Sequence, residues 1–291
     1  MNVPAAARVA PLPAAAPALS GGRIGREAIR ALYAEIALYP KPGLVSPVDS
    51  GAHDDMDFRL FMRSLFALRG YFVRIAEAGA ADAGFPALRR LGIAAEQRML
   101  AATAGVNTHR GAIFSLGLLA AAAGSLSRRH HSLHSGALGR AVHETWGRDI
   151  LGAAPGSTDS HGGRAVDRYG VRGARQEAAD GFPLLFTVAL PALRTALRAG
   201  DADAALVETL FVLITHLDDT NLLHRGGRDG LAFARREASA FLDAGSVGRA
   251  GWQHRAVAIH RAFIARRLSP GGAADMLAAA WFVHRLESTG G

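Results

Sequence analysis

The sequence predicts an all-α protein, and three observations favour this class. Alanine and arginine dominate the composition while β-branched residues are sparse, which favours helix. Apolar residues recur at steps of three or four along many segments, as they do on the buried face of a helix. No segment shows the alternating pattern, rich in Val, Ile or Thr, that is typical of a strand. We therefore expect a single-domain helical bundle of roughly ten helices.

The chain is expected to begin with a disordered tail, residues 1–23, in which prolines interrupt an Ala-rich stretch. The same prolines break the continuous apolar run that a signal peptide needs. The helical domain then covers residues 24–291. Its first helix spans residues 25–38, where Ile29, Leu32 and Ile36 share one face, and a loop rich in Pro and Gly follows over residues 40–51.

A second helix begins at Phe58 and presents one apolar stripe, formed by Phe61, Met62, Leu65, Leu68 and Phe72. Further helices are expected at residues 86–104, 109–123, 133–151, 174–180, 183–199, 202–217, 229–243, 250–267 and 272–287. The polar segment over residues 155–173 is expected to be irregular. Loops of that length inside a compact domain are usually functional or disordered.

The bulk charge favours anionic ligands, because the formal net charge is +8 and the pI is about 10.9. The arginines are scattered rather than clustered with aromatic residues, so general arginine usage explains them better than nucleic-acid binding. The absence of cysteine suits a cytoplasmic protein. The longest uncharged run, residues 111–127, falls short of the ~20 apolar residues of a membrane span and indicates a buried core helix.

The stretch ALYPKPGLV contains Lys41, the only lysine of the chain. Pro40 and Pro42 restrict the backbone on both sides, so the ammonium is held in place. An ammonium is a compact point charge, whereas a guanidinium is a flat fork. A single retained lysine therefore indicates a phosphate-binding role, with chance retention of one codon as the alternative.

A histidine and three aspartates precede the second helix, in the order His53, Asp54, Asp55 and Asp57. Asp is favoured at a helix N-cap, which accounts for one or two of the carboxylates. Three carboxylates beside a histidine also suit Mg²⁺ coordination or acid–base catalysis. Both interpretations remain open from the residues alone.

Two further stretches place polar residues at helix starts. In GVNTHRGAIFSLGLL, either Asn107 or Thr108 can cap the next helix, and His109 and Arg110 add donors at an end suited to anions. An ordinary capped helix is the simpler explanation. In SPGGAADMLAAAWF, a Ser–Pro start is followed by two glycines that permit close approach of a ligand to the backbone; these residues are Ser269, Pro270, Gly271 and Gly272.

The segment YGVRGARQEAADGFPLL places Arg172 and Arg175 among glycines, with Glu177 nearby. This arrangement suits a polyphosphate, and a surface Arg–Glu pair is the alternative.

The segment THLDDTNLLHRGG follows an apolar helix stripe. If that helix continued, Asp219 would face outward, and the inward side would carry Asp218, Asn221, His224 and Arg225. A carboxylate on an apolar face is costly unless it is paired or bound to a metal ion, so this group indicates a functional site.

Six stretches in order resemble the triphosphoribosyl-dephospho-coenzyme A synthase family, and the resemblance covers nearly everything after residue 24. They are PKPGLV (40–45), GAHDDMD (51–57), GVNTHRGAIFSLGLL (105–119), YGVRGARQEAADGFP (169–183), DTNLLHRGG (219–227) and SPGGAADMLAA (269–279). The DTNLLHRGG stretch and the overall length are nearer the malonate decarboxylase branch than the citrate lyase branch. The resemblance points to Asp219 rather than Asp218, so we expect the preceding helix to end at about Leu217.

The resemblance implies a polar nucleotide-binding cavity in which the 2′-hydroxyl of 3′-dephospho-coenzyme A attacks C1′ of ATP. Adenine would leave while the triphosphate stays on the ribose, and Mg²⁺ would act as cofactor. Implied catalytic residues are His53 or Asp57 as the base, together with Asp219. Implied metal ligands are Asp55, Asp219, Glu35 and Glu177. Implied substrate-binding residues are Lys41, Asn107, Thr108, His109, Arg110, Arg175, Asn221, Arg225, Ser269, Gly271 and Gly272.

The product would pass to the transferase that loads an acyl carrier subunit, and a homodimer is left open. A Mg²⁺-dependent helical hydrolase of ADP-ribosyl or other N-glycosidic compounds is the enzymatic alternative. Only a transferase needs the second substrate to release adenine. An arginine-rich nucleic-acid-binding module is the alternative from another class, and it would show salt-sensitive binding without ATP turnover.

Overall fold

The computed structural model describes residues 19–134, 136–153 and 161–289, and every regular element within these ranges is helical. This confirms the all-α class. The bounds are α1 Gly21–Ala37, α2 Phe58–Ala80, α3 Phe85–Ala102, α4 Arg110–Arg128, α5 Ala137–Gly152, α6 His161–Tyr169, α7 Ala174–Ala179, a π-helical turn Leu185–Ala189, α8 Leu190–Ala199, α9 Ala202–His216, α10 Thr220–Asp243, a 3₁₀ turn Ser246–Gly248, α11 Trp252–Ala265 and α12 Gly271–Thr289.

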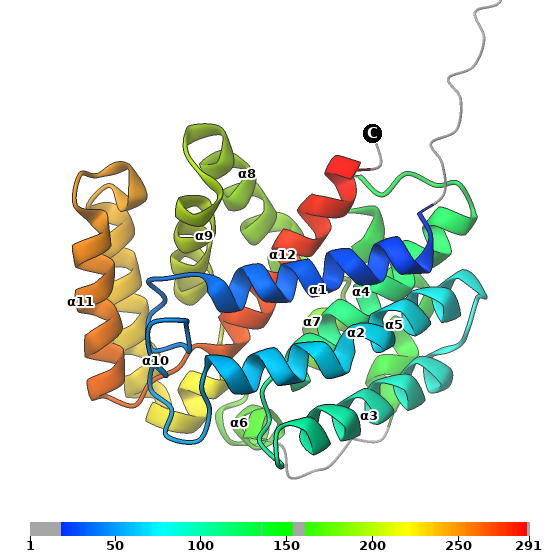
Figure 1. Ribbon diagram of the computed structural model, residues 1–291, viewed down its shortest axis with the longest axis horizontal. Coiled ribbons are helices and arrows are strands. Elements are labelled where there is room, and N and C mark those ends of the chain that lie inside the picture. The colour runs from blue at the N-terminus through cyan, green and yellow to red at the C-terminus, as the bar shows by residue number, and fades with distance from the viewer. Residues whose placement is uncertain (1–18, 135, 154–160, 290–291) are drawn as a thin grey trace, which may run out of the picture.

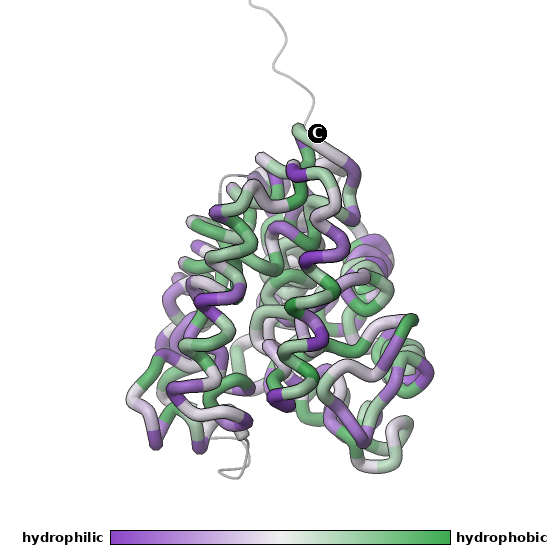
Figure 2. The backbone as a smooth tube through the Cα atoms, turned by 90° about the vertical axis from the view of Figure 1, so that its left-hand side faces the viewer, coloured by the Kyte–Doolittle hydropathy of each residue, from purple (hydrophilic) through white to green (hydrophobic). Residues whose placement is uncertain are grey.

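The centre of the bundle is α4, which packs against α1, α2, α3, α5 and α12 (Figure 1). By length and composition α4 could cross a membrane, but 83% of that stretch is buried inside the fold. This burial agrees with the core helix expected from its uncharged run. Along the outer helices hydrophilic and hydrophobic residues alternate (Figure 2), as they do on helices with one buried face.

Small residues let α2 and α4 approach until their backbones touch. A Cβ added at Gly79 would lie 1.9 Å from the carbonyl oxygen of Ala121, and one added at Gly124 would lie 2.0 Å from that of Ala76. Only glycine fits at these two positions. The close contact joins the C-terminal parts of α2 and α4 and fixes the position of α4, whose opposite end lies at the candidate site.

The N-terminal boundary differs slightly from the expectation. Residues 1–18 of the expected tail lie outside the described residues. Helix α1 already begins at Gly21, because the side chain of Ser20 caps it by accepting a hydrogen bond from the backbone N–H of Arg23.

The expectation of an irregular segment over residues 155–173 was wrong in part, because residues 161–169 form α6. Its two leading glycines disfavour helix, but α6 packs on α10 and buries Ala165. Tertiary packing therefore overrides the local preference. Residues 154–160 lie outside the described residues.

The predicted break before Asp219 is confirmed. Helix α9 ends at His216, and α10 begins at Thr220 with Asp219 as its N-cap. Helix α10 runs past the glycines at 226 and 227 with a kink at Gly227, where φ is +62°. The new helix start brings residues 219–221 against the first turn of α12.

Candidate active site

Lys41 is buried beside the end of α1, with 1% of its surface exposed. Its Nζ donates to the carbonyl oxygen and to Oε1 of Glu35, each at 2.6 Å. Burial lowers the pKa of Lys41, while the Glu35 carboxylate acts in the opposite direction. The single lysine is therefore one half of a buried ion pair, with two of its three N–H donors on Glu35.

His260 of α11 holds the loop that carries Lys41, a role that no pattern in the sequence indicates. Its Nδ1 lies 2.5 Å from the carbonyl oxygen of Lys41 and 3.1 Å from the backbone nitrogen of Gly43. Its Nε2 lies 3.0 Å from Oδ2 of Asp49. The ring thus ties both ends of the loop to α11.

Asp219 joins α10 to α12 and is 1% exposed. Its Oδ1 accepts from the backbone N–H groups of Asn221 and Leu222, and its Oδ2 accepts from that of Ala273 at 2.9 Å. Burial raises its pKa, while these hydrogen bonds lower it. Asp218, by contrast, is partly exposed and pairs with Arg235, so the choice of Asp219 as the inward carboxylate is confirmed.

The two glycines that start α12 admit protein groups, where a ligand was expected. A Cβ added at Gly272 would lie 3.1 Å from Oδ2 of Asp219, and one added at Gly271 would lie 2.8 Å from Nδ2 of Asn221. These glycines therefore bring the first turns of α10 and α12 together.

Asp275 of α12 also belongs to this group, although it was not among the residues expected at the site. A Cβ added at Gly111 of α4 would lie 1.9 Å from its Oδ2, so its carboxylate packs directly on the first turn of α4. Burial, with the charges of Glu35 and Asp219, raises the pKa of Asp275 well above its usual range. We call Glu35, Lys41, His109, Asp219 and Asp275 the central cluster.

His109 starts α4 within the central cluster and is 3% exposed. Burial and the nearby charge of Lys41 lower its pKa to about 3, so its imidazole is neutral. The cap predicted nearby is present in part, because Oδ1 of Asn107 accepts from the backbone N–H of Arg110 at 3.1 Å. The Arg110 side chain pairs with Glu96.

A second group lies beside the cluster where the loop after α1 meets α10 and the start of α12. Arg225 donates to Nδ1 of His53 at 3.0 Å and to the carbonyl oxygen of Ala52. Because Nδ1 accepts, the proton of neutral His53 lies on Nε2, which is 2.9 Å from Oγ of Ser269. Burial and the charge of Arg225 lower the pKa of His53 to about 4. Both ring nitrogens are engaged, which disfavours His53 as a base.

Several expected site residues make structural contacts. The carboxylate of Asp57 caps α2 by accepting from the N–H of Leu60 at 2.7 Å, and Asp55 is exposed. Arg175 donates to carbonyl oxygens at the end of α5, including those at positions 150 and 153 at 2.5 Å each. Glu177 accepts from the N–H of Leu184. The segment over residues 169–185 thus fastens α5 to the turn after α7.

No group of three or more His, Cys, Asp or Glu side chains within the described ranges stands at metal-binding spacing. The four expected metal ligands are therefore not gathered into one protein cage. Mg²⁺ usually keeps waters and binds through one or two carboxylates plus substrate phosphates. Glu35 and Asp219, which both raise the pKa of Asp275, fit such a partial donor set.

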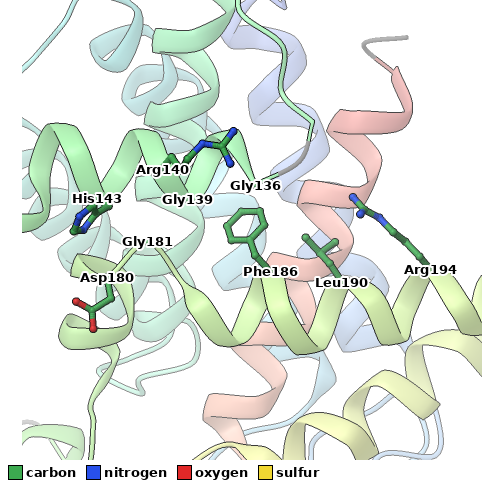
Figure 3. Close-up of a pocket in the computed structure, with 9 residues that line it drawn as sticks. All are labelled: Gly136, Gly139, Arg140, His143, Asp180, Gly181, Phe186, Leu190 and Arg194. Carbon is green, nitrogen blue, oxygen red and sulfur yellow. The ribbon is translucent and has the colours of Figure 1, made fainter.

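A separate cavity of about 350 Å³ lies between α5 and the segment from Asp180 to α8 (Figure 3). It is lined by Gly136, Gly139, Arg140, His143, Asp180, Gly181, Phe186, Leu190 and Arg194. None of the expected site residues lines it. Arg194 pairs with Glu287, and Asp180 pairs with Arg172, so part of its lining charge is already balanced.

The family model described as "CitG: ATP:dephospho-CoA triphosphoribosyl transferase" matches residues 22–291. The chain belongs to this family. Among similar proteins, a 2-(5''-triphosphoribosyl)-3'-dephosphocoenzyme-A synthase of Pectobacterium atrosepticum is 42% identical over 90% of this chain and 88% of its own length.

Two other members of the CitG family carry the name "Probable 2-(5''-triphosphoribosyl)-3'-dephosphocoenzyme-A synthase". The protein from Acinetobacter calcoaceticus is 39% identical over 88% of both chains. The protein from Vibrio cholerae is 37% identical over 98% of this chain and 97% of its own. No solved structure matches the chain.

Proposed function

We propose that this member of the CitG family transfers the 5-triphosphoribosyl group of ATP to the 2′-hydroxyl of 3′-dephospho-coenzyme A and releases adenine. The product is the precursor of an acyl carrier prosthetic group. Family membership over residues 22–291 supports the proposal. So does the arrangement of the central cluster, in which one ammonium and three carboxylates meet at the starts of α4, α10 and α12.

The triphosphate of ATP is expected to bind beside the Lys41 ammonium and the start of α4. Lys41 keeps one N–H donor beyond its two bonds to Glu35, and the start of α4 carries the positive end of the helix dipole. Mg²⁺ held by Glu35 and Asp219 would neutralise phosphate charge when bound. Asn221 lies beside Asp219 at the first turn of α12, and Arg225 contacts the loop that carries His53; both are expected to contact the second substrate.

Proton removal from the attacking hydroxyl is the step for which Asp275 is best suited. Its raised pKa brings the carboxylate closer to the range in which a general base works at neutral pH. His53 has both nitrogens engaged, and Asp57 caps α2, so neither serves this role as readily. The new C1′–O bond forms as the bond to adenine breaks, and the displaced base accepts a proton.

Mass analysis of the product from ATP and dephospho-coenzyme A tests the proposal. We expect free adenine and a new species that carries both the coenzyme and the triphosphoribosyl group, formed only when both substrates are present. Adenine release from ATP alone, without the adduct, would favour the N-glycoside hydrolase instead. Intact ATP under both conditions would contradict both activities.

We further propose that the product serves malonate decarboxylase rather than citrate lyase, on the resemblance of the DTNLLHRGG stretch. The product would then be accepted by the transferase that loads the malonate decarboxylase acyl carrier subunit. Presenting it to the loading transferases of both systems distinguishes the branches. Preferential loading of the citrate lyase carrier would contradict this assignment.

A further inference from the structure

The imidazole of His109 ends in a nitrogen that the protein leaves without a partner. His109 is 3% exposed at the start of α4, and among the residues that the structure describes its Nε2 has no hydrogen-bond partner. Buried polar side-chain atoms are nearly always hydrogen-bonded, so this atom calls for a specific explanation. A ligand atom that arrives during function would supply the missing partner.

Two hydroxyl groups determine which ring nitrogen carries the proton. The hydroxyl of Thr108 donates to Oγ of Ser64 at 2.7 Å, and Ser64 is completely buried in α2. Oγ of Ser64 lies 2.7 Å from Nδ1 of His109. Because Ser64 accepts from Thr108, its own proton is available for Nδ1, which then acts as acceptor. The neutral ring must carry its hydrogen on Nε2.

The surroundings of this N–H favour an anionic acceptor. The charge of Lys41 is close enough to lower the pKa of His109, and the positive end of the α4 dipole lies at the same place. Phe61 contacts the ring edge-on, with centroids 5.0 Å apart, and fixes its plane. A neutral N–H donor beside the Lys41 ammonium and at a helix start suits an oxygen of a phosphate group.

We propose that Ser64 is a positioning residue that holds His109 as the Nε2–H tautomer, and that this N–H donates to a phosphate oxygen of the bound nucleotide. The second half rests on the proposed function, which supplies a triphosphate substrate. Ser64 acts through His109, since its hydroxyl is taken up by Thr108 and the ring.

Nitrogen-15 NMR of the histidine-labelled protein tests the tautomer without any turnover. We expect the His109 ring of the wild type to show a protonated Nε2 and an unprotonated Nδ1. Ser64→Ala should shift the ring towards a mixture of tautomers. Ser125→Ala, which removes another buried hydroxyl farther along α4, should not. A wild-type ring with its proton on Nδ1 would overturn the proposal.

Inorganic tripolyphosphate and adenosine separate the phosphate contact from a base or ribose contact. We expect tripolyphosphate to shift the Nε2 resonance and adenosine to leave it unchanged. A shift with adenosine alone, or with neither probe, would overturn the phosphate assignment. Failure of the product assay with a positive tripolyphosphate shift would contradict the proposed reaction and leave this contact standing.

Paired substitutions of His109 give a second readout in affinity. Glutamine places an amide N–H near the position of Nε2, whereas asparagine reaches only the position of Nδ1. His109→Asn should therefore weaken tripolyphosphate binding about tenfold relative to His109→Gln, the usual worth of a hydrogen bond to a charged group. Circular dichroism confirms that both variants fold. Equal affinities of two folded variants would contradict a contact through Nε2.

Discussion

Replacing Lys41 with methionine should destabilise the fold by about 3–5 kcal/mol, because the change leaves the Glu35 carboxylate buried without its cation. The two side chains are 1% and 9% exposed, so water replaces little of the lost interaction. Methionine keeps a similar length and apolar stem, which limits the effect to the charge. Glu35→Gln should cost less, about 1–3 kcal/mol, because its amide oxygen and the carbonyl at position 35 still accept from the ammonium.

A double-mutant cycle isolates the pair. In the double variant no unpaired charge is buried. Its free energy of unfolding should therefore fall by about 2 kcal/mol less than the sum of the decreases in the two single variants. Urea unfolding at pH 7, followed by far-ultraviolet circular dichroism, measures all four proteins. Losses that add within about 0.5 kcal/mol would show that the two groups do not interact, and would refute the buried ion pair.

Four further outcomes follow from the site. Folding raises the pKa of Asp275 above 3.8, so ionisation of this carboxyl destabilises the fold as the pH rises above that value. By urea unfolding, Asp275→Asn should be more stable than wild type at pH 8, and this gain in stability should shrink towards pH 4. The imidazole of His53 should titrate by NMR near pH 4, because burial and Arg225 disfavour its charged form; a midpoint near 6.5 would contradict the Arg225 contact. Arg175→Ala should lower stability by about 1–3 kcal/mol and leave kcat within a few-fold, whereas a loss of kcat with normal stability would restore Arg175 as a substrate contact. Gly111→Ala should abolish adenine release, because its Cβ would displace the Asp275 carboxylate, while Gly152→Ala, where the added Cβ meets nothing within 4 Å, should retain it.

The class of the fold and the break before Asp219 could be predicted from the sequence. Helical spacing of apolar residues reports burial directly, which is why most of the expected helices lie close to those observed. The helix expected at residues 229–243 is an exception, because α10 already begins at Thr220 and continues through a kink at Gly227. The inward side of Asp219 required the resemblance, because a continued helix would have pointed it outward. The segment over residues 155–173 was misjudged because the packing of α6 on α10 has no local signal.

The composition of the site was less predictable from the sequence. Asp275 lies just past the first turn of α12, and only the approach of α4 and α1 in the fold buries its carboxylate beside other acids and raises its pKa. Arg175 is a residue type that often binds phosphate, yet its partners are carbonyl groups at the end of α5, 22 to 25 residues earlier in the chain. His260 carried no signal at all, since its partners lie more than 200 residues away. These roles depend on contacts between distant segments.

A crystal structure with dephospho-coenzyme A and a non-reactive ATP analogue tests most directly whether the central cluster binds the nucleotide. The triphosphate is expected within hydrogen-bond distance of Nζ of Lys41 and Nε2 of His109, with the ribose C1′ facing Asp275. A nucleotide seated instead in the cavity lined by Arg140 and Arg194 would contradict this site.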